Sequence, residues 1–403
     1  MSDTILYGPT RAAAETGPSE PVTADGWTRG RALSVAIVAV ATGLMAIGAI
    51  MTVSAAAPRE GGVLGWPLWD YPAMRQLIFL FGALLAMLVV TCVPYELWSK
   101  ARGAPAIMLL ALALGVSALV LVPGIGTEVN NARRWFQIGP AHYGLRIQPS
   151  ELFKLALPVF LALWIGRWAD VRRFTRGFLP AVAIIAAIVG VVGIEDFGTA
   201  ALLAAVGGAM LLMGGARFWH LLLLVLPSVS AFGYLLVSRA HRMERLVSFR
   251  NIWADPEGSG YQAIQSLCTI ARGGWWGVGL GNGFIKDYLP AARTDFIFSV
   301  ICEELGIIGG MAVIALLVVL LYNGGAAMRR CPDVSGKLLA FGIVLMIGLQ
   351  AVINIAVVTV TVPTKGIALP LVSAGGSGAV VIGAMVGTLA NIARRTPDTP
   401  TPP

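Results

Sequence analysis

The sequence predicts an all-α membrane protein that crosses a bilayer about ten times. Two observations carry this prediction: a shortage of charged residues and a series of long apolar runs. Of the 403 residues only 12% are charged, whereas 57% are hydrophobic, and the mean hydropathy is +0.78. A soluble protein usually has about a quarter of its residues charged. The composition therefore fits a surface that is solvated by lipid.

Ten apolar runs approach the roughly 20 residues that a helix needs to cross the hydrocarbon core. The predicted spans are 32–53, 76–93, 104–122, 152–168, 178–194, 197–216, 218–237, 296–322, 338–362 and 367–392. An even number of spans places both ends of the chain on one side of the membrane.

The polar segments divide the chain further. Residues 1–31 are polar and lack the apolar core and cleavage site of a signal peptide, so we expect a disordered cytoplasmic tail. The Thr/Pro-rich residues 395–403 predict a second cytoplasmic tail. Between them, residues 32–394 form one membrane domain, whose longest loop, 238–295, joins the seventh and eighth spans.

Lysine and arginine gather in every second connection, which the positive-inside rule assigns to the cytoplasm together with both termini. The external loops 123–150 and 238–295 are also basic, but long loops cross the membrane regardless of charge. A basic outer face favours an anionic partner at the bilayer surface. Ordinary solvated charge on a long loop explains the same pattern equally well.

Several kinds of site are disfavoured. Four scattered cysteines without a CxxC pair and only three histidines argue against a disulfide framework or a zinc site. The Gly-rich stretch 272–283 has no surrounding βαβ unit and no following Gly-Lys-Ser/Thr, so it is not a nucleotide loop. Its two tryptophans instead predict a turn at the level of the lipid headgroups.

The start of the fourth span carries the first candidate residues. Glu151 and Lys154 lie three residues apart, so they share one helix face and can form an ion pair. One interpretation is a structural pair at a capped helix start. The other follows from the cost of placing an ammonium group near hydrocarbon: Lys154 faces an external cavity and binds a phosphate.

Further charged residues stand at or near the outer ends of the eighth and tenth spans. Asp295, at the start of the eighth span, is either a helix N-cap or a general base that takes a proton from a bound hydroxyl. Glu303 and Glu304 follow on the same helix, and we expect them to pack against protein. Lys365, the one charge of the last loop, is either an interfacial anchor or an anion ligand.

Several short segments resemble the SEDS family of bacterial cell-wall synthesis, and they run in the family's order across nearly the whole chain outside the tails. They are Ala132–Trp135, Gln148–Lys154, Asp196–Thr199, Gly260–Gln262, Thr294–Phe298, Glu303–Gly306 and Ser373–Ser377. The segments Pro363–Gly366 and Gly279–Asp295 are more similar to the division-type, FtsW-like branch than to the elongation-type, RodA-like branch.

The resemblance implies a SEDS fold and a peptidoglycan glycosyltransferase that polymerises lipid II outside the cytoplasmic (inner) membrane, at the division septum. Asp295 would be the catalytic general base. The residues expected to bind substrate are Arg134, Glu151, Lys154, Gln262, Gln265, Ser266, Asp287, Lys365 and Ser373.

The family also implies a divalent cation, Mg²⁺ or Mn²⁺, whose ligands are not assigned. The implied partners are lipid II, the nascent glycan, a class B penicillin-binding transpeptidase and other divisome proteins, with no nucleic acid. The chain departs from the family's pattern at Ala291, Arg293, Ala374 and Glu195. The first three flank Asp295 and the start of the last span, and so bear on how the acceptor or the metal is held.

Two other functions would use a similar chain. A flippase for the same lipid also needs many helices and a basic cavity, but it needs no base at the outer boundary. A non-catalytic division scaffold needs neither. Replacing Asp295 by alanine would therefore spare the flippase and the scaffold, whereas it would inactivate the polymerase.

Overall fold

The computed structural model describes residues 29–56, 72–120, 122, 124–129, 132–138, 145–237 and 240–395. Most of the two predicted tails lies outside these residues. The exceptions are residues 29–31, which already belong to the first helix, and Arg395, which ends the last one.

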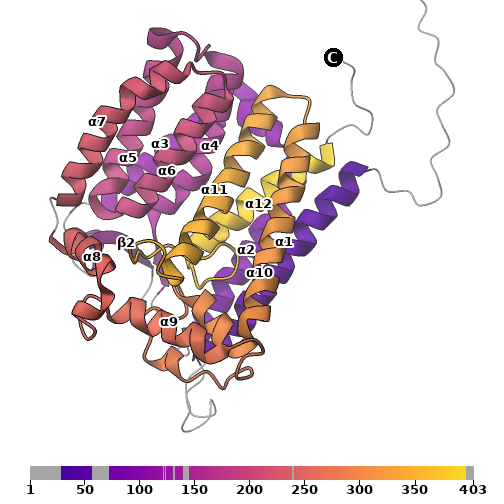
Figure 1. Ribbon diagram of the computed structural model, residues 1–403. Helices are drawn as coiled ribbons and strands as arrows, with labels where there is room; N and C mark the ends of the chain where they lie inside the picture. Colours follow the sequence, from indigo (N-terminus) through magenta and orange to yellow (C-terminus); the bar gives the residue numbers. More distant parts are fainter. Residues whose placement is uncertain are drawn as a thin grey trace, which may run out of the picture.

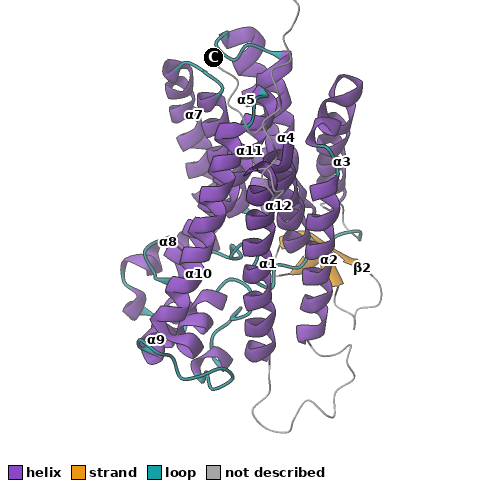
Figure 2. Ribbon diagram, turned by 90° about the vertical axis from the view of Figure 1, so that its right-hand side faces the viewer, coloured by secondary structure: helices purple, strands orange, loops and turns teal. Residues whose placement is uncertain are grey.

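Long helices form a bundle, and shorter helices and a small sheet gather at one end of it (Figures 1 and 2). The helices of the bundle are α1 (Arg29–Ala56), α2 (Pro72–Cys92), α3 (Ala104–Val120), α4 (Phe153–Leu163, extended by short helical turns to Pro149–Trp168), α5 (Leu179–Glu195), α6 (Phe197–Met213), α7 (Phe218–Val237), α10 (Ile297–Arg330), α11 (Val334–Val358) and α12 (Ser377–Arg395).

These helices confirm the predicted membrane fold. In the described part of the chain, eight helical segments are long and apolar enough to span a membrane, and α6 is apolar but shorter, with 17 residues. Together with α7, an apolar helix of 20 residues, they match the ten predicted spans one to one. The start of α1 and the end of α12 lie at the same end of the bundle, at the top of Figure 1.

The last predicted span is wrong at its beginning. It was expected to start at residue 367, but α12 starts at Ser377, and residues 359–376 form a non-helical segment that we call the final loop. Pro370 and two glycines interrupt helical hydrogen bonding there. The final loop packs inside the bundle: a Cβ atom at Gly48 of α1 would lie 2.4 Å from the carbonyl oxygen of Val372.

A small antiparallel sheet is a second difference from the all-α prediction. It consists of β1 (Thr127–Val129), β2 (Ala132–Ile138) and β3 (Leu145–Ile147), in the order β1-β2-β3. Its aromatic and β-branched residues favour strands. However, β1 and β3 have only three residues each, and the seven residues of β2 do not alternate between apolar and polar, so the sequence lacks the pattern from which a strand is recognised.

The long segment before α10 folds against that helix. It contains α8 (Ala240–Arg250) and α9 (Tyr261–Gly273). Gly306 breaks α10 with a φ of 73°, which frees carbonyl groups before the break. The carbonyls of Glu303 and Glu304 accept hydrogen bonds from the amides of Val278 and Gly279 at 2.9 and 3.0 Å. The Gly-rich turn is therefore joined to the helix at its break.

Glu303 and Glu304 are buried and reinforce this junction, in agreement with their expected packing role. One Glu303 oxygen accepts hydrogen bonds from the amides of Phe284 and Ile285 at 2.8 and 2.9 Å. Glu304 forms an ion pair of 2.7 Å with Lys286, and both side chains are almost fully buried. The ammonium group also donates to the Ser54 carbonyl of α1 at 2.7 Å. The cluster thus joins α1, α10 and the turn.

We predict that Lys286→Met lowers the free energy of unfolding by about 3–5 kcal/mol, because it leaves the Glu304 carboxylate buried without its partner. Denaturant unfolding in detergent measures the change. Arg173→Met is the control, since the Arg173–Asp170 pair of 3.6 Å is largely exposed and contributes less than about 1 kcal/mol. Equal losses for the two variants would contradict the prediction.

Candidate functional site

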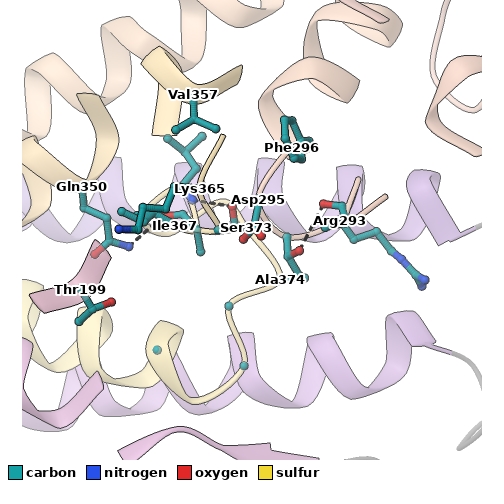
Figure 3. A pocket seen from close by; sticks show the side chains of 18 of the residues that line it. Thr199, Arg293, Asp295, Phe296, Gln350, Val357, Lys365, Ile367, Ser373 and Ala374 are labelled. Carbon is teal, nitrogen blue, oxygen red and sulfur yellow. Dashed lines mark hydrogen bonds between the residues drawn. The ribbon is translucent and has the colours of Figure 1, made fainter. Parts of the chain in front are cut away.

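A cavity of about 1870 Å³ opens at the end of the bundle that carries the sheet and α8. Figure 3 shows part of its wall, formed by the segment before α10, the final loop and α11. The charged residues that line it are eight cations and three acids: Arg75, Arg134, Arg146, Lys154, Arg245, Lys286, Arg293, Lys365, Glu151, Asp196 and Asp295. The excess of positive charge suits an anionic ligand.

Asp295 lies on the turn immediately before α10 and faces the cavity. It is not the helix N-cap: that position belongs to Phe296, and no side chain caps the helix. The carboxylate lies against the final loop, since a Cβ atom at Gly366 would be 2.7 Å from Oδ2 of Asp295. The N-cap alternative is therefore wrong, and a chemical role for this carboxylate stays open.

The surroundings shift the pKa of Asp295. Part of the side chain faces the cavity, but the protein removes most of its water, and this loss of solvation is the main cause of a raised pKa. The negative charge of Asp196 raises the pKa further, whereas Arg245 and Arg134 lower it. The net result is a pKa of about 6, which suits a group that must accept a proton near neutral pH.

Lys365 is held over the start of α6. Its ammonium group lies 4.0 Å from the centre of the Phe197 ring, a cation–π contact. Its stem fills the space over Gly198, where a Cβ atom would lie 2.4 Å from Cε of Lys365. Lys365 lines the cavity, so it is not a simple interfacial anchor.

Asp196 is the N-cap of α6. Its carboxylate accepts hydrogen bonds from the amides of Gly198 and Thr199, both at 3.1 Å, and from the Thr199 hydroxyl at 2.8 Å. The Gln148 amide group also donates to it at 3.5 Å. Asp196 therefore lines the cavity with oxygens that are already largely used in capping.

Glu151 and Lys154 form the expected ion pair, at 2.8 Å, with side chains that are 13% and 4% exposed. Both also line the cavity, so the structural and the binding interpretations are compatible. Glu151, just before α4, packs against the start of α12: a Cβ atom at Gly378 would lie 2.5 Å from Oε2 of Glu151. The main-chain N–H of Gln148 donates to the Ser377 hydroxyl at 3.0 Å. This bond holds the segment before α4 against the start of α12.

The other predicted binding residues divide into two groups. Gln262 and Ser373 line the cavity with Arg134. The Ser373 hydroxyl accepts a hydrogen bond from the Leu369 amide at 2.6 Å, so it also shapes the final loop. Gln265 and Ser266 do not line the cavity.

The expectation for Ser266 is corrected by its contacts. Its buried hydroxyl lies 2.7 Å from the Ser299 hydroxyl and donates to the Val358 carbonyl at 2.7 Å, which ties α9 to α10 and α11. The carbonyl of Gln265 accepts a hydrogen bond from Thr269 within α9. Asp287 ends the short turn Ile285–Asp287, and its side chain lies outside the described residues.

Four arginines that line the cavity were not among the residues predicted to bind substrate. Arg75 comes from α2, Arg146 from β3, Arg245 from α8 and Arg293 from the turn before α10. Arg245 donates to the Thr364 carbonyl at 3.3 Å. The basic external loops were the available signal, but only the fold shows which arginines converge.

The cavity wall suits a highly charged anion. Arg75 and Arg134 both line it, and arginine side chains form strong charge-assisted hydrogen bonds with phosphate oxygens. A diphosphate, with several oxygens and high charge, fits such a wall.

A resident metal site is not evident. In the described residues, no group of three or more His, Cys, Asp or Glu side chains lies close enough to hold an ion. Mg²⁺ is commonly bound by one or two carboxylates together with substrate phosphates. Because Asp196 caps α6 and Glu151 is paired with Lys154, oxygens of the substrate would supply most ligands of such an ion.

Comparison with known proteins agrees with this architecture. The family described as "Cell cycle protein" (FtsW/RodA/SpoVE) matches residues 34–397. The chain is 42% identical to a probable peptidoglycan glycosyltransferase FtsW of Nitrosococcus halophilus, covering 85% of this chain and 87% of the relative. It is 38% identical to the stage V sporulation protein E of Bacillus subtilis, covering 87% of this chain and 94% of that protein.

Solved structures share the fold. A chain described under "Structural coordination of polymerization and crosslinking by a peptidoglycan synthase complex" matches with a TM-score of 0.70 and 28% identity, covering 89% of this chain and 96% of the other. The rod shape determining protein RodA of Thermus thermophilus matches with a TM-score of 0.63 and 26% identity, covering 89% and 96%. The resemblance in the motifs is thus confirmed, and the chain is a member of the FtsW/RodA/SpoVE (SEDS) family.

Proposed function

We propose that this protein is a peptidoglycan glycosyltransferase that polymerises lipid II into glycan strands at the outer face of the cytoplasmic membrane during cell division. One observation carries the proposal: a carboxylate with a pKa of about 6 faces a cationic cavity at the end of a membrane-spanning bundle. The names of the relatives support it, since several are probable peptidoglycan glycosyltransferases FtsW.

Asp295 acts as the general base. It takes the proton from the acceptor sugar's 4-hydroxyl while that oxygen attacks the anomeric carbon of the donor. The bond between this carbon and the diphosphate oxygen breaks, and its electron pair leaves with the undecaprenyl diphosphate. Attack from the face opposite the leaving group inverts the anomeric carbon, from the α bond of the donor to the β bond of the polymer.

The cavity cations hold the diphosphates and stabilise the negative charge that develops on the leaving group. Arg134 and Lys365 line the cavity with Asp295, whereas Lys154 lines it at the start of the fourth span. Arg75 lines the same cavity. Cations fixed by the fold need no reorganisation during the reaction, so they favour the transition state over the substrate.

The divalent cation expected from the family fits as an ion bound mainly by diphosphate oxygens. When bound, Mg²⁺ or Mn²⁺ would neutralise charge on the leaving diphosphate. The three carboxylates that line the cavity have other roles: Asp196 caps α6, Glu151 is paired with Lys154, and Asp295 acts as the base.

The proposal includes a location and partners. Both termini lie in the cytoplasm and the cavity opens outside the inner membrane, as the distribution of Lys and Arg indicates. A class B penicillin-binding transpeptidase crosslinks the product, together with other divisome proteins at the septum. The similarity to a chain of a peptidoglycan synthase complex supports such an assembly.

Asp295→Asn is expected to reduce polymerisation by about 10²–10⁴-fold, because the amide keeps the shape of the side chain but cannot accept the proton. The assay follows glycan strands made from fluorescent lipid II and Mn²⁺ by the full-length protein with its transpeptidase partner. Asp170→Asn, in the exposed connection between α4 and α5, is the control and should retain activity. Absence of polymer from the wild type, or equal polymer from Asp295→Asn, would favour the flippase or the scaffold.

The pH dependence tests the state of the base. Because Asp295 must be ionised, kcat/KM should fall tenfold per pH unit below about pH 6. Arg245 lowers the pKa of Asp295, so Arg245→Gln should move this midpoint to higher pH. Arg217→Gln, between α6 and α7, should leave it unchanged. A midpoint that Arg245→Gln lowers would contradict the assignment of Asp295 as the titrating base.

A further inference from the structure

Two buried amide side chains on α11 face the final loop. Gln350 and Asn354 are four residues apart, so they lie on one face of the helix, and both are almost completely buried. Gln350 donates to the Ala368 carbonyl at 2.8 Å. Figure 3 shows Gln350 beside the final loop and Ile367 between it and Asp295.

Asn354 joins the turn that precedes α10 and carries Asp295, called here the catalytic turn, to the final loop. Its amide nitrogen donates to the main-chain carbonyl of Asp295 at 2.8 Å and to that of Ile367 at 2.7 Å. Both neighbours are acceptors, so only the amino group of the side chain can satisfy them. One side chain therefore fixes the main chain of the proposed base relative to the loop that carries Lys365.

The position of Asn354 costs free energy of folding, because one of its polar atoms is left without a partner. The Asn354 Oδ1 atom is buried without a hydrogen-bond partner among the described residues. An unsatisfied buried acceptor costs about 1–3 kcal/mol, and such atoms in a native structure call for an explanation. A requirement to hold two carbonyl groups at one point would supply it.

We propose that Asn354 is a positioning residue for Asp295, one that sets the distance between the general base and the cationic final loop. The proposal rests on the proposed function. Asn354 is not among the residues that line the cavity, so its role would be exerted through Asp295. Reacting groups must be placed closely, and a shift of about 1 Å can cost 10²-fold in rate.

The charged groups that face Asp295 come from several elements. Arg134 belongs to β2, Arg245 to α8 and Asp196 to the start of α6. Lys365 and Arg293 line the same cavity from the final loop and the catalytic turn. If Asn354 no longer holds the turn, the carboxylate gains water, so the pKa of Asp295 should fall from about 6 toward its ordinary value of 3.8.

Asn354→Leu tests the proposal, because leucine keeps a similar volume and removes the amide. Asn391→Leu is a matched control: Asn391 is equally buried in α12. It donates to the Thr91 carbonyl at 2.8 Å and accepts from the Tyr95 amide at 3.0 Å. Those contacts lie at the opposite end of the bundle, next to the end of α2.

Two readouts are needed on the full-length protein in nanodiscs with its transpeptidase partner. The first is polymerisation of fluorescent lipid II, with kcat and KM measured separately. The second is labelling of Asp295 by a hydrophobic carbodiimide, which attacks protonated carboxyl groups, followed by peptide mass spectrometry across pH. The second readout does not depend on activity.

For Asn354→Leu we expect kcat to fall about 10²-fold, with KM changed less than threefold and the labelling midpoint moved to lower pH. Asn391→Leu should change neither quantity, although it should destabilise the fold comparably. Wild-type kcat and midpoint in a folded Asn354→Leu protein would overturn the positioning role, as would equal effects in the two variants. A midpoint shift without any wild-type polymerisation would instead reject the proposed function and leave the positioning role standing.

Discussion

Buried main-chain groups need hydrogen-bond partners, and this requirement shapes the end of the bundle that carries the cavity. Irregular backbone at membrane depth is tolerated only where protein or a water-filled cavity satisfies it. The final loop is such a segment, inserted between α11 and α12. Buried side chains supply its hydrogen-bond partners. Asn354 and Gln350 of α11 donate to carbonyls of the loop, and the Ser373 hydroxyl, within the loop, accepts from the Leu369 amide. The cavity wall is therefore a set of loops whose shape is fixed by buried polar groups.

Buried charged groups also need partners. Within the described bundle, the most deeply buried cations, Lys154 and Lys286, each face a carboxylate at hydrogen-bonding distance. The cavity as a whole keeps an excess of cations over acids. Such an excess raises the free energy of the empty state, and an anionic ligand lowers it. Asp295 lies within this positive field, which keeps the pKa of a poorly solvated carboxyl near 6 rather than higher.

The sequence was sufficient for features that depend on local patterns. Apolar run length predicted all ten spans, because crossing a bilayer is a requirement on each segment alone. The motifs singled out Asp295, Lys154 and Arg134, which line one cavity in the structure, although spacing alone could not distinguish a base from an N-cap at Asp295. The sequence was insufficient where distant segments meet. Ser266 was taken for a binding residue and is a packing contact, and Asn354 gave no signal because an isolated amide in an apolar helix has no pattern. The convergence of Arg75, Arg146, Arg245 and Arg293 likewise depends on packing between loops.

The break in α10 gives the molecule a modular construction. The part after Gly306, residues 307–330, extends roughly 36 Å at ~1.5 Å per residue, which is enough to cross a bilayer by itself. The part before the break is instead joined through Glu303 and Glu304 to the Gly-rich turn. A Cβ atom at position 306 would lie 2.2 Å from the Trp275 carbonyl oxygen, so this junction admits only glycine. Gly306 therefore marks the boundary between the part of α10 that is long enough to cross a bilayer and the part that is joined to the Gly-rich turn.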